Sequence, residues 1–266
     1  MAGALDGIRI IDCSIALTGP YPAALLGDQG AEVIKVERPG LGDIARWVGV
    51  AVNGVSSLFQ SCNRGKRSIA VDITTEEGSE IVRAMAAEAD VFIQNFRPGA
   101  LDRAGLGYEA LSADHPELIY VSLSGFGDVG PYAHKGAYDT VIQAYAGLAT
   151  NQADPDVGDP VFLRQTAADK ITGLYAVQAI TAALLARERG AGGQHIKLSM
   201  TDAVVSPSAS SLLTVTLPAF CVVVSLSRTS LPVSLVRMIA SALAFSAAVT
   251  PVLELCSLMA ARAEFR

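Results

Sequence analysis

The sequence is poor in the residues that build metal centres and disulfide frameworks. Its four cysteines stand at positions 13, 62, 221 and 256, and no two of them form a CxxC pair or a short Cys/His spacing. Zinc sites and small disulfide scaffolds depend on such spacings. We therefore expect no metal site, and we expect the cysteines to be reduced thiols in a cytoplasmic compartment.

Basic residues are outnumbered by acidic ones. The chain has 20 Lys and Arg residues against 26 Asp and Glu residues, which gives a formal net charge of -6. We therefore expect no nucleic-acid partner held through bulk positive charge. The first residues, MAGALDGIRIIDCS, lack a basic segment followed by a long apolar run, so we expect no cleaved signal peptide.

Nucleotide-binding and triad motifs are absent as well. The sequence contains no GxxxxGKS/T motif, and no GxGxxG motif follows its first predicted strand at 8–12. An NAD-dependent enzyme is therefore disfavoured. The histidines, at positions 115, 134 and 195, have no partner that the sequence can assign, so a Ser-His-Asp triad has little support.

What the sequence does have is strand and helix patterns in alternation. Short runs rich in β-branched residues predict strands, and amphipathic or apolar stretches between them predict helices. A long predicted helix over about 167–189 ends at the glycines of GAGGQ. The predicted strands lie at 8–12, 32–37, 68–73, 90–95, 118–125 and 195–200. This alternation predicts an α/β fold, with an open, mainly parallel sheet and helices on both faces.

The character of the chain changes toward its end. Between Asp202 and Arg228 there is no charged residue. We therefore separate residues 1–206 from an atypical, apolar tail at 207–266. Because about 20 apolar residues can span a membrane, a membrane segment within 207–261 is kept as the less favoured alternative.

Basic and amide side chains are concentrated in loops after the predicted strands. Ligands of open α/β sheets bind beyond the carboxyl ends of strands, where we expect these loops to converge. Such a pocket suits a phosphate-rich ligand, although each cation taken singly is better explained as a solvated surface charge. Phe96 offers an aromatic face beside cations, which suits an adenine ring and its phosphates. The polar residues in question are Arg38, Arg46, Arg64, Lys66, Arg67, Asn95, Arg97 and Arg103.

One carboxylate, Asp169, stands at the start of the predicted helix at 167–189. Asp is favoured in the first turn of a helix, where its charge meets unpaired N–H groups, so capping is the simpler explanation. The other explanation is that Asp169 is a nucleophile, because a carboxylate can attack an activated acyl group and hold it covalently. The residues alone favour the cap.

Several segments resemble the class III CoA-transferase family, which includes formyl-CoA transferase. Among them are NRGKRSIAVDI, NFRPGALDRAGLGYEAL and DKITGLYAVQAITAALLARERGAGGQHIKLSMTDAV, and the resemblance is continuous over about residues 4–205. It implies the Rossmann-like large domain of that family. It also implies the family's activity, which is transfer of CoA from an acyl-CoA to a small carboxylic acid, with CoA as substrate, no tightly bound cofactor and a homodimeric enzyme.

The same resemblance implies roles for individual residues. In that family the nucleophile is an Asp in the block that holds Asp169 here, which implies a mixed anhydride and then an aspartyl-CoA thioester at Asp169. The segment from Lys135 to Asp139 is expected near the pantetheine and acyl end of the substrate. The residues that the resemblance implies for CoA binding are Leu17, Arg38, Asn63, Arg64, Lys66, Asn95, Phe96, Arg97, Arg103, Lys135, Tyr138 and Asp139.

Two alternatives remain beside this interpretation. The related α-methylacyl-CoA racemases move a proton with a His that precedes an Asp, whereas Tyr138 precedes Asp139 here. Tyrosine, with a reference pKa of about 10, is a poor neutral-pH substitute for an imidazole near 6.5, so transfer is favoured. The second alternative is a non-catalytic CoA-binding protein, because beyond about residue 206 we find neither the family's glycine-rich loop nor its second domain.

Overall fold

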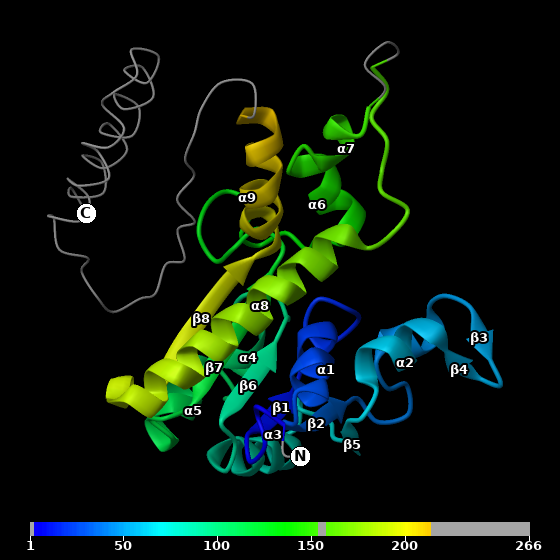
Figure 1. Ribbon diagram of the computed structural model, residues 1–266. Helices are drawn as coiled ribbons and strands as arrows, with labels where there is room; N and C mark the ends of the chain where they lie inside the picture. Colours follow the sequence, from blue (N-terminus) through cyan, green and yellow to red (C-terminus); the bar gives the residue numbers. More distant parts are fainter. Residues whose placement is uncertain (1–2, 154–157, 214–266) are drawn as a thin grey trace, which may run out of the picture. The chain divides into compact units, whose positions relative to one another are not determined.

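The β-branched, apolar runs form six strands of one parallel sheet. The computed structural model describes residues 3–153 and 158–213 and, within these ranges, the side chains up to residue 206. The strands lie in the order β5-β2-β1-β6-β7-β8 (Figure 1). Their bounds are β1 Arg9–Asp12, β2 Glu32–Glu37, β5 Arg67–Ala70, β6 Val91–Gln94, β7 Ile119–Ser124 and β8 Gln194–Ser199. The predicted α/β fold is confirmed, although β5 ends at Ala70 and not at residue 73.

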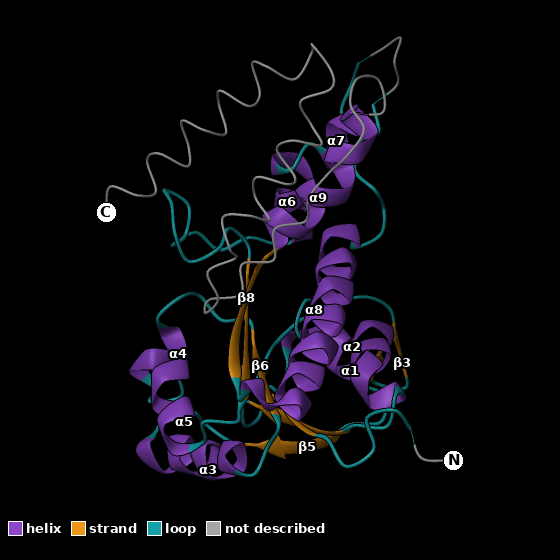
Figure 2. Cartoon of the chain, turned by 60° about the vertical axis from the view of Figure 1, so that its left-hand side comes forward, coloured by secondary structure: helices purple, strands orange, loops and turns teal. Residues whose placement is uncertain are grey.

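Alternate residues of the central strands enter two separate hydrophobic cores. On β1, Ile10 joins one core and Ile11 the other, and on β6 Ile93 and Phe92 divide in the same way. Helices α1 (Pro20–Asp28) and α8 (Ala167–Ala186) cover the first core. Helices α3 (Glu76–Ala87), α4 (Ala100–Arg103) and α5 (Tyr108–Asp114) cover the second, on the opposite face of the sheet (Figure 2). A parallel sheet buried on both faces is the arrangement that the sequence predicts.

The strand order reverses between β1 and β6. From β1 the chain builds outward through β2 and β5, and it then returns to the other side of β1 with β6, β7 and β8. The loops that follow β1 and β6 therefore diverge, which opens a crevice at their carboxyl ends. The Asn95 side chain joins these loops: its Oδ1 accepts from the Ile15 N–H at 2.8 Å, and its Nδ2 donates to the Ile15 carbonyl at 2.8 Å.

Side-chain caps fix several helix starts. Thr75 accepts from the Gly78 N–H at 3.1 Å at the start of α3. Helix α9 (Met200–Leu213) is capped by Ser199, whose Oγ accepts from the Asp202 N–H at 3.3 Å. The long helix ends as expected in a glycine-containing turn, with Gly190 at a φ of 87°.

The segments between the main strands contain elements that the periodicity did not predict. After β2 the chain forms a short hairpin whose Asn53-Gly54 turn has positive φ at both residues, as a type I′ turn requires. Helices α6, α8 and α9 share a third core of Ile142, Ala168 and Met200. The additional elements are η1 Ile44–Trp47, β3 Ala51–Val52, β4 Val55–Ser56, α2 Ser57–Asn63, α6 Asp139–Tyr145, α7 Leu148–Asn151 and η2 Arg187–Ala191.

The apolar tail predicted for 207–266 falls mostly outside the described residues. Only its first residues, up to Leu213, are described, as the last turns of α9. Within the described ranges, no helix combines the length and the apolar character that a membrane crossing needs. The alternative of a membrane segment within 207–261 concerns residues that lie outside them.

Candidate active site

Asp169 lies in the first turn of α8 without capping it. Its Oδ1 accepts a hydrogen bond from the hydroxyl of Thr18, which lies in the loop between β1 and α1. The N-terminus of α8 is capped from outside the helix, because the carboxylate of Asp139 accepts from the Asp169 N–H at 3.0 Å. Thr166, the residue at the N-cap position, makes no side-chain cap bond. The structure therefore leaves the Asp169 carboxylate available for a role other than capping.

Helix α6 holds the segment that leads into α8. Gln143, one turn after Asp139, is fully buried and donates from Nε2 to the Asp139 carboxylate. Its Oε1 accepts from the Leu163 N–H at 2.9 Å, and its Nε2 lies 3.3 Å from the Gln165 carbonyl. Because the two α6 side chains bind both the approach to α8 and its first turn, they fix where Asp169 lies.

A close approach of α8 to α1 brings Asp169 to Thr18. At Gly173 of α8, a Cβ atom would lie only 2.8 Å from the Tyr21 ring and 3.2 Å from Pro22. The absence of a side chain at this position allows the two helices to pack closely. Thr18 immediately precedes the start of α1 and also approaches the sulfur of Met200, at 3.8 Å from its Oγ1. The geometry of the Thr18 to Asp169 contact therefore depends on this helix packing.

The surroundings of Asp169 disfavour its charge without abolishing it. Burial raises the pKa of Asp169 to about 6; the Thr18 hydroxyl acts to lower this pKa, and the nearby Asp139 carboxylate acts to raise it. At neutral pH such a group is still mostly ionised, by about ten to one. A carboxylate that is ionised yet poorly solvated is a competent nucleophile toward an activated acyl group.

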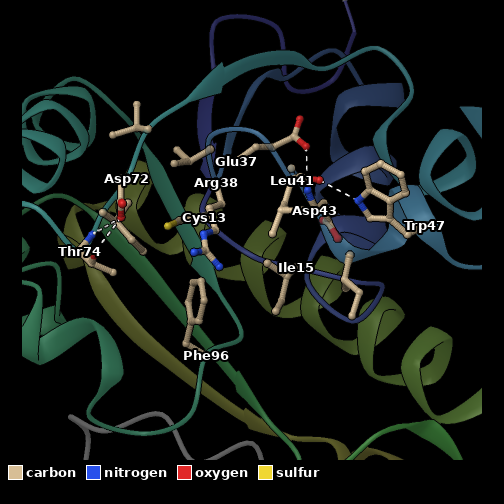
Figure 3. Close-up of a pocket in the computed structure, with 15 residues that line it drawn as sticks. Cys13, Ile15, Glu37, Arg38, Leu41, Asp43, Trp47, Asp72, Thr74 and Phe96 are labelled. Carbon is tan, nitrogen blue, oxygen red and sulfur yellow. Dashed lines mark hydrogen bonds between the residues drawn. The ribbon is translucent and has the colours of Figure 1, made fainter.

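A cavity of about 550 Å³ opens beyond the carboxyl ends of β1, β2, β5 and β6. Figure 3 shows the Arg38 side chain in the middle of this cavity, extending toward the side on which Phe96 lies. Two of the residues predicted for CoA therefore line one pocket. Its other walls are largely apolar and include Cys13, Ile15, Val36, Leu41, Ile44, Trp47, Val71 and Ile73.

The loop between β1 and α1 runs from this pocket to Asp169. Ile15 lines the pocket, and Thr18, three residues later, binds Asp169. Leu17, also predicted for CoA, lies between them and is buried. A ligand that fills the pocket and extends along this loop would reach the Asp169 carboxylate.

Several of the predicted cations are free of ion pairs within the described ranges. These are Arg38, Arg97, Arg103 and Lys135. Arg97 passes so close to Gly136 that a Cβ there would lie 3.0 Å from its guanidinium group, so the loop after β6 meets the 132–138 segment. Lys135 places its ammonium nitrogen 4.2 Å from the centre of the Tyr132 ring. Tyr138 is 72% exposed.

Other predicted residues are engaged within the chain. Arg64 pairs with Asp28, and Lys66 is buried with its ammonium group 2.9 Å from the side-chain oxygen of Asn63. None of Asn63, Arg64 and Lys66 lines the pocket beside Arg38.

The expectation that the basic loops converge at the carboxyl ends of the strands is wrong for Arg67, whereas Arg46 lies beside Glu37, the last residue of β2. Arg67 opens β5 and pairs with Glu32, the first residue of β2, so it lies at the amino ends of these strands. Arg46 donates two hydrogen bonds of 2.7 Å to Glu37 and lies over a phenylalanine ring. Both cations have a structural partner, and neither lines the pocket.

Two residues of the site, Thr18 and Gln143, have no signal in the sequence that predicts their role. Thr18 is one hydroxyl among many in a loop, and Gln143 is one amide in a helix. Their contacts join positions 151 and 20 residues apart, so only the packed structure identifies them. Within the described residues, no cluster of His, Cys, Asp or Glu side chains is arranged to hold a metal ion.

Comparison with known proteins agrees with this geometry. The model of a family described as CoA-transferase family III matches residues 5–246. The chain belongs to CoA-transferase family III. The match extends beyond residue 205, where the resemblance seen in the sequence ends.

Individual relatives support the assignment. Succinyl-CoA:glutarate CoA-transferase of Mus musculus is 44% identical over 203 residues, which are 76% of this chain and 46% of that protein. Acetyl-CoA:oxalate CoA-transferase of Acetobacter aceti is 42% identical over 205 residues, 77% of this chain and 52% of that protein. A crystal structure of a CAIB/BAIF family protein from Brucella suis has a TM-score of 0.76 and 42% sequence identity, and covers 81% of this chain and 58% of its own. The chain thus spans about half the length of the curated relatives.

Proposed function

We propose that this chain is the CoA-binding and nucleophile-bearing part of an acyl-CoA:carboxylate CoA-transferase. The observation that carries the proposal is the Asp169 carboxylate, which is partly buried, bound by Thr18 and relieved of capping by Asp139. The names of the relatives describe those proteins as CoA-transferases that use dicarboxylates such as glutarate and oxalate. A small carboxylic acid is accordingly the proposed acceptor here.

The chemistry assigned to Asp169 is a sequence of acyl substitutions. An Asp169 oxygen attacks the thioester carbonyl, the C–S bond breaks, and CoA leaves as a thiolate while a mixed anhydride forms. The thiolate attacks the aspartyl carbonyl of the anhydride, which releases the first carboxylate and leaves CoA on Asp169 as a thioester. The acceptor carboxylate then repeats these two steps in reverse, so that a new acyl-CoA leaves and the Asp169 carboxylate is restored. The steps balance without an oxidant or a reductant.

The proposed position of CoA follows the unpaired cations. The adenine ring enters the 550 Å³ pocket against Phe96, with Arg38 beside it. The phosphates meet Arg97 and Arg103, and Lys135 lies toward the pantetheine arm; none of these cations has an ion pair within the described residues. The pantetheine arm then follows the loop that carries Leu17 and Thr18 toward Asp169. A pocket of this volume is within the range of natural small-molecule sites.

The same proposal covers the organisation of the protein. Residues 1–206 form the unit that binds CoA, a second copy of the chain is the partner, and the cytoplasm is the compartment. A racemase function has no observation in its favour, because in the described ranges the carboxylates of Asp139 and Asp169 are bound by a glutamine, a threonine and a backbone N–H, and by no histidine.

Covalent labelling tests the proposal directly. The chain is incubated with succinyl-CoA or acetyl-CoA, treated with hydroxylamine and digested, and the peptides are analysed by mass spectrometry. We expect a hydroxamate at Asp169 and none in Asp169→Ala, whose CoA exchange with glutarate or oxalate should also be lost. Asp128→Ala is the matched control, since Asp128 is exposed and pairs with Lys197. A hydroxamate on another residue, or full exchange by Asp169→Ala, overturns the assignment.

A further inference from the structure

A group of charged side chains lies buried beneath the loop between β1 and α1. It comprises Asp12, Lys35, Asp43 and Lys66, whose side chains are between 0% and 2% exposed. The ammonium nitrogen of Lys35 lies 2.9 Å from Asp43 and 3.8 Å from Asp12, and that of Lys66 lies 2.7 Å from Asp12. Two positive and two negative groups make this cluster neutral. We call it the buried charge cluster.

The first half of the cluster holds the beginning of the loop. Lys35 donates to the carbonyl of Ser14, and Asp43 accepts from the Ala16 N–H at 2.8 Å. Ala16 has a φ of 64°, a left-handed conformation that residues other than glycine rarely adopt. Such a conformation persists where the surroundings fix it, and it is common at functional sites. Asp43 supplies the contact that fixes it here.

The second half of the cluster holds the end of the loop. Lys66 donates to the Pro20 carbonyl at 2.8 Å, to Asp12 at 2.7 Å and to Asn63 at 2.9 Å. An ammonium group has three N–H donors, and these acceptors use all of them. Lys66 therefore has no donor left for a phosphate, and it does not line the pocket.

We propose that the buried charge cluster is a positioning unit, which fixes the loop between β1 and α1 so that Thr18 faces Asp169. Lys66 is part of this unit and does not bind a CoA phosphate. The cluster contacts the loop at Ser14, Ala16 and Pro20, and Thr18 lies between the last two of these points. The importance of the Thr18 to Asp169 contact rests on the proposed function. The assignment of Lys66 to the cluster does not depend on that function.

Reductive methylation of the wild-type chain, with formaldehyde and a borohydride, tests whether Lys66 is buried in the cluster or exposed at the CoA site. We expect Lys66 and Lys35 to stay unmodified with or without CoA. Lys197, which is 51% exposed, should be modified in both conditions. Lys135 should be modified and then protected by CoA. Modification of Lys66 at a rate like that of Lys197, with protection by CoA, would overturn the proposal. If CoA protects nothing, the CoA-binding proposal fails while the result for Lys66 stands.

Lys66→Met tests the positioning role, with Lys197→Met as the matched control. We expect hydrogen exchange of the 13–19 amides to become at least about tenfold faster, and the ratio of affinities for CoA and dephospho-CoA to stay within about twofold. At saturating acyl-CoA, labelling of Asp169 should slow about tenfold or more, with the half-saturating concentration changed by less than about twofold. A merely structural role would lower the amount of folded protein and move neither the exchange of this one segment nor the rate per folded molecule.

Opposite results overturn the positioning role. Unchanged exchange in 13–19 would contradict the positioning role, and a loss of preference for CoA over dephospho-CoA would assign Lys66 to the phosphate that dephospho-CoA lacks. If Lys66→Met does not fold, Asn63→Ala is used, because it removes one acceptor from Lys66 and leaves its charge pair with Asp12 in place. Its smaller increase in exchange should again be confined to 13–19, and an increase spread over the whole chain contradicts the proposal.

Discussion

Two sets of cations near the carboxyl ends of the strands differ in burial and in ion pairing. Lys35 and Lys66 are buried, and each has a carboxylate within 2.9 Å. Arg38, Arg97 and Lys135 are exposed and have no ion pair within the described residues. The comparison shows that a position near the end of a strand does not by itself make a cation a ligand-binding residue. Pairing and burial separate the cations that hold the backbone from those that remain available to a ligand.

The pKa values of two carboxylates near the loop between β1 and α1, Asp12 and Asp169, are shifted in opposite directions. Burial acts to raise the pKa of Asp12, but the ammonium groups of Lys35 and Lys66 outweigh it and hold the pKa below its ordinary value. Within the described residues no ammonium group pairs with Asp169, and burial raises its pKa to about 6. The loop between β1 and α1 thus lies between a strongly paired carboxylate, Asp12, and one that is bound only by the Thr18 hydroxyl, Asp169.

Removing a buried cation should give the largest effect. In Lys35→Met, the carboxylates of Asp12 and Asp43 keep their burial and lose a partner, so we expect the free energy of unfolding to fall by about 3 to 5 kcal/mol. Urea denaturation followed by circular dichroism measures this change. Arg97→Met is the control from the exposed set and should stay within about 0.5 kcal/mol of the unmodified protein. Equal losses in the two variants would erase the distinction between the sets.

The sequence predicted the sheet better than the site, for a physical reason. Strands such as Val91–Gln94 are predicted by the composition of their own residues, and the Asn53-Gly54 turn has a local sequence signal as well. Lys35 within the apolar run EVIKVE was also a readable signal, because a buried lysine needs a carboxylate partner. Which carboxylate it meets is not local. The contact of Thr18 with Asp169 depends on α8 packing against α1 at Gly173, which no periodicity records.

Removing an exposed cation should change binding and leave stability intact. In Arg38→Ala we expect the affinity for CoA to fall by about 1.5 kcal/mol, or about tenfold, through loss of a charged hydrogen bond. Titration calorimetry measures the affinity, and urea denaturation should show a change below about 0.5 kcal/mol. Arg67→Ala is the matched control, since Arg67 pairs with Glu32 at the amino ends of β5 and β2, away from the pocket at their carboxyl ends. A similar loss of affinity in Arg67→Ala would show that overall charge, and not the pocket, attracts CoA.

The smallest expected effect concerns the pH dependence of stability at Asp169. The pKa of this carboxyl is about 6 in the folded chain and near 3.9 in an unfolded one. Between these values the folded state binds more protons than the unfolded state, so the free energy of unfolding falls as pH rises through this window. Asp169→Asn stays neutral and escapes this loss. We therefore expect Asp169→Asn to gain stability over the unmodified protein from about pH 4 to about pH 7, by about 1 kcal/mol after screening by solvent.

Urea denaturation of both proteins across this pH range provides the measurement. Asp128→Asn gives the opposite sign, because the hydrogen bond from Lys197 holds the pKa of Asp128 below its ordinary value. The unmodified protein should lose the contribution of Asp128 as pH falls, so Asp128→Asn should lose relative stability as pH rises. If the curves for Asp169→Asn and Asp128→Asn have the same slope, Asp169 is solvated like a surface carboxylate. Its place between Thr18 and Asp139 would then confer no special reactivity.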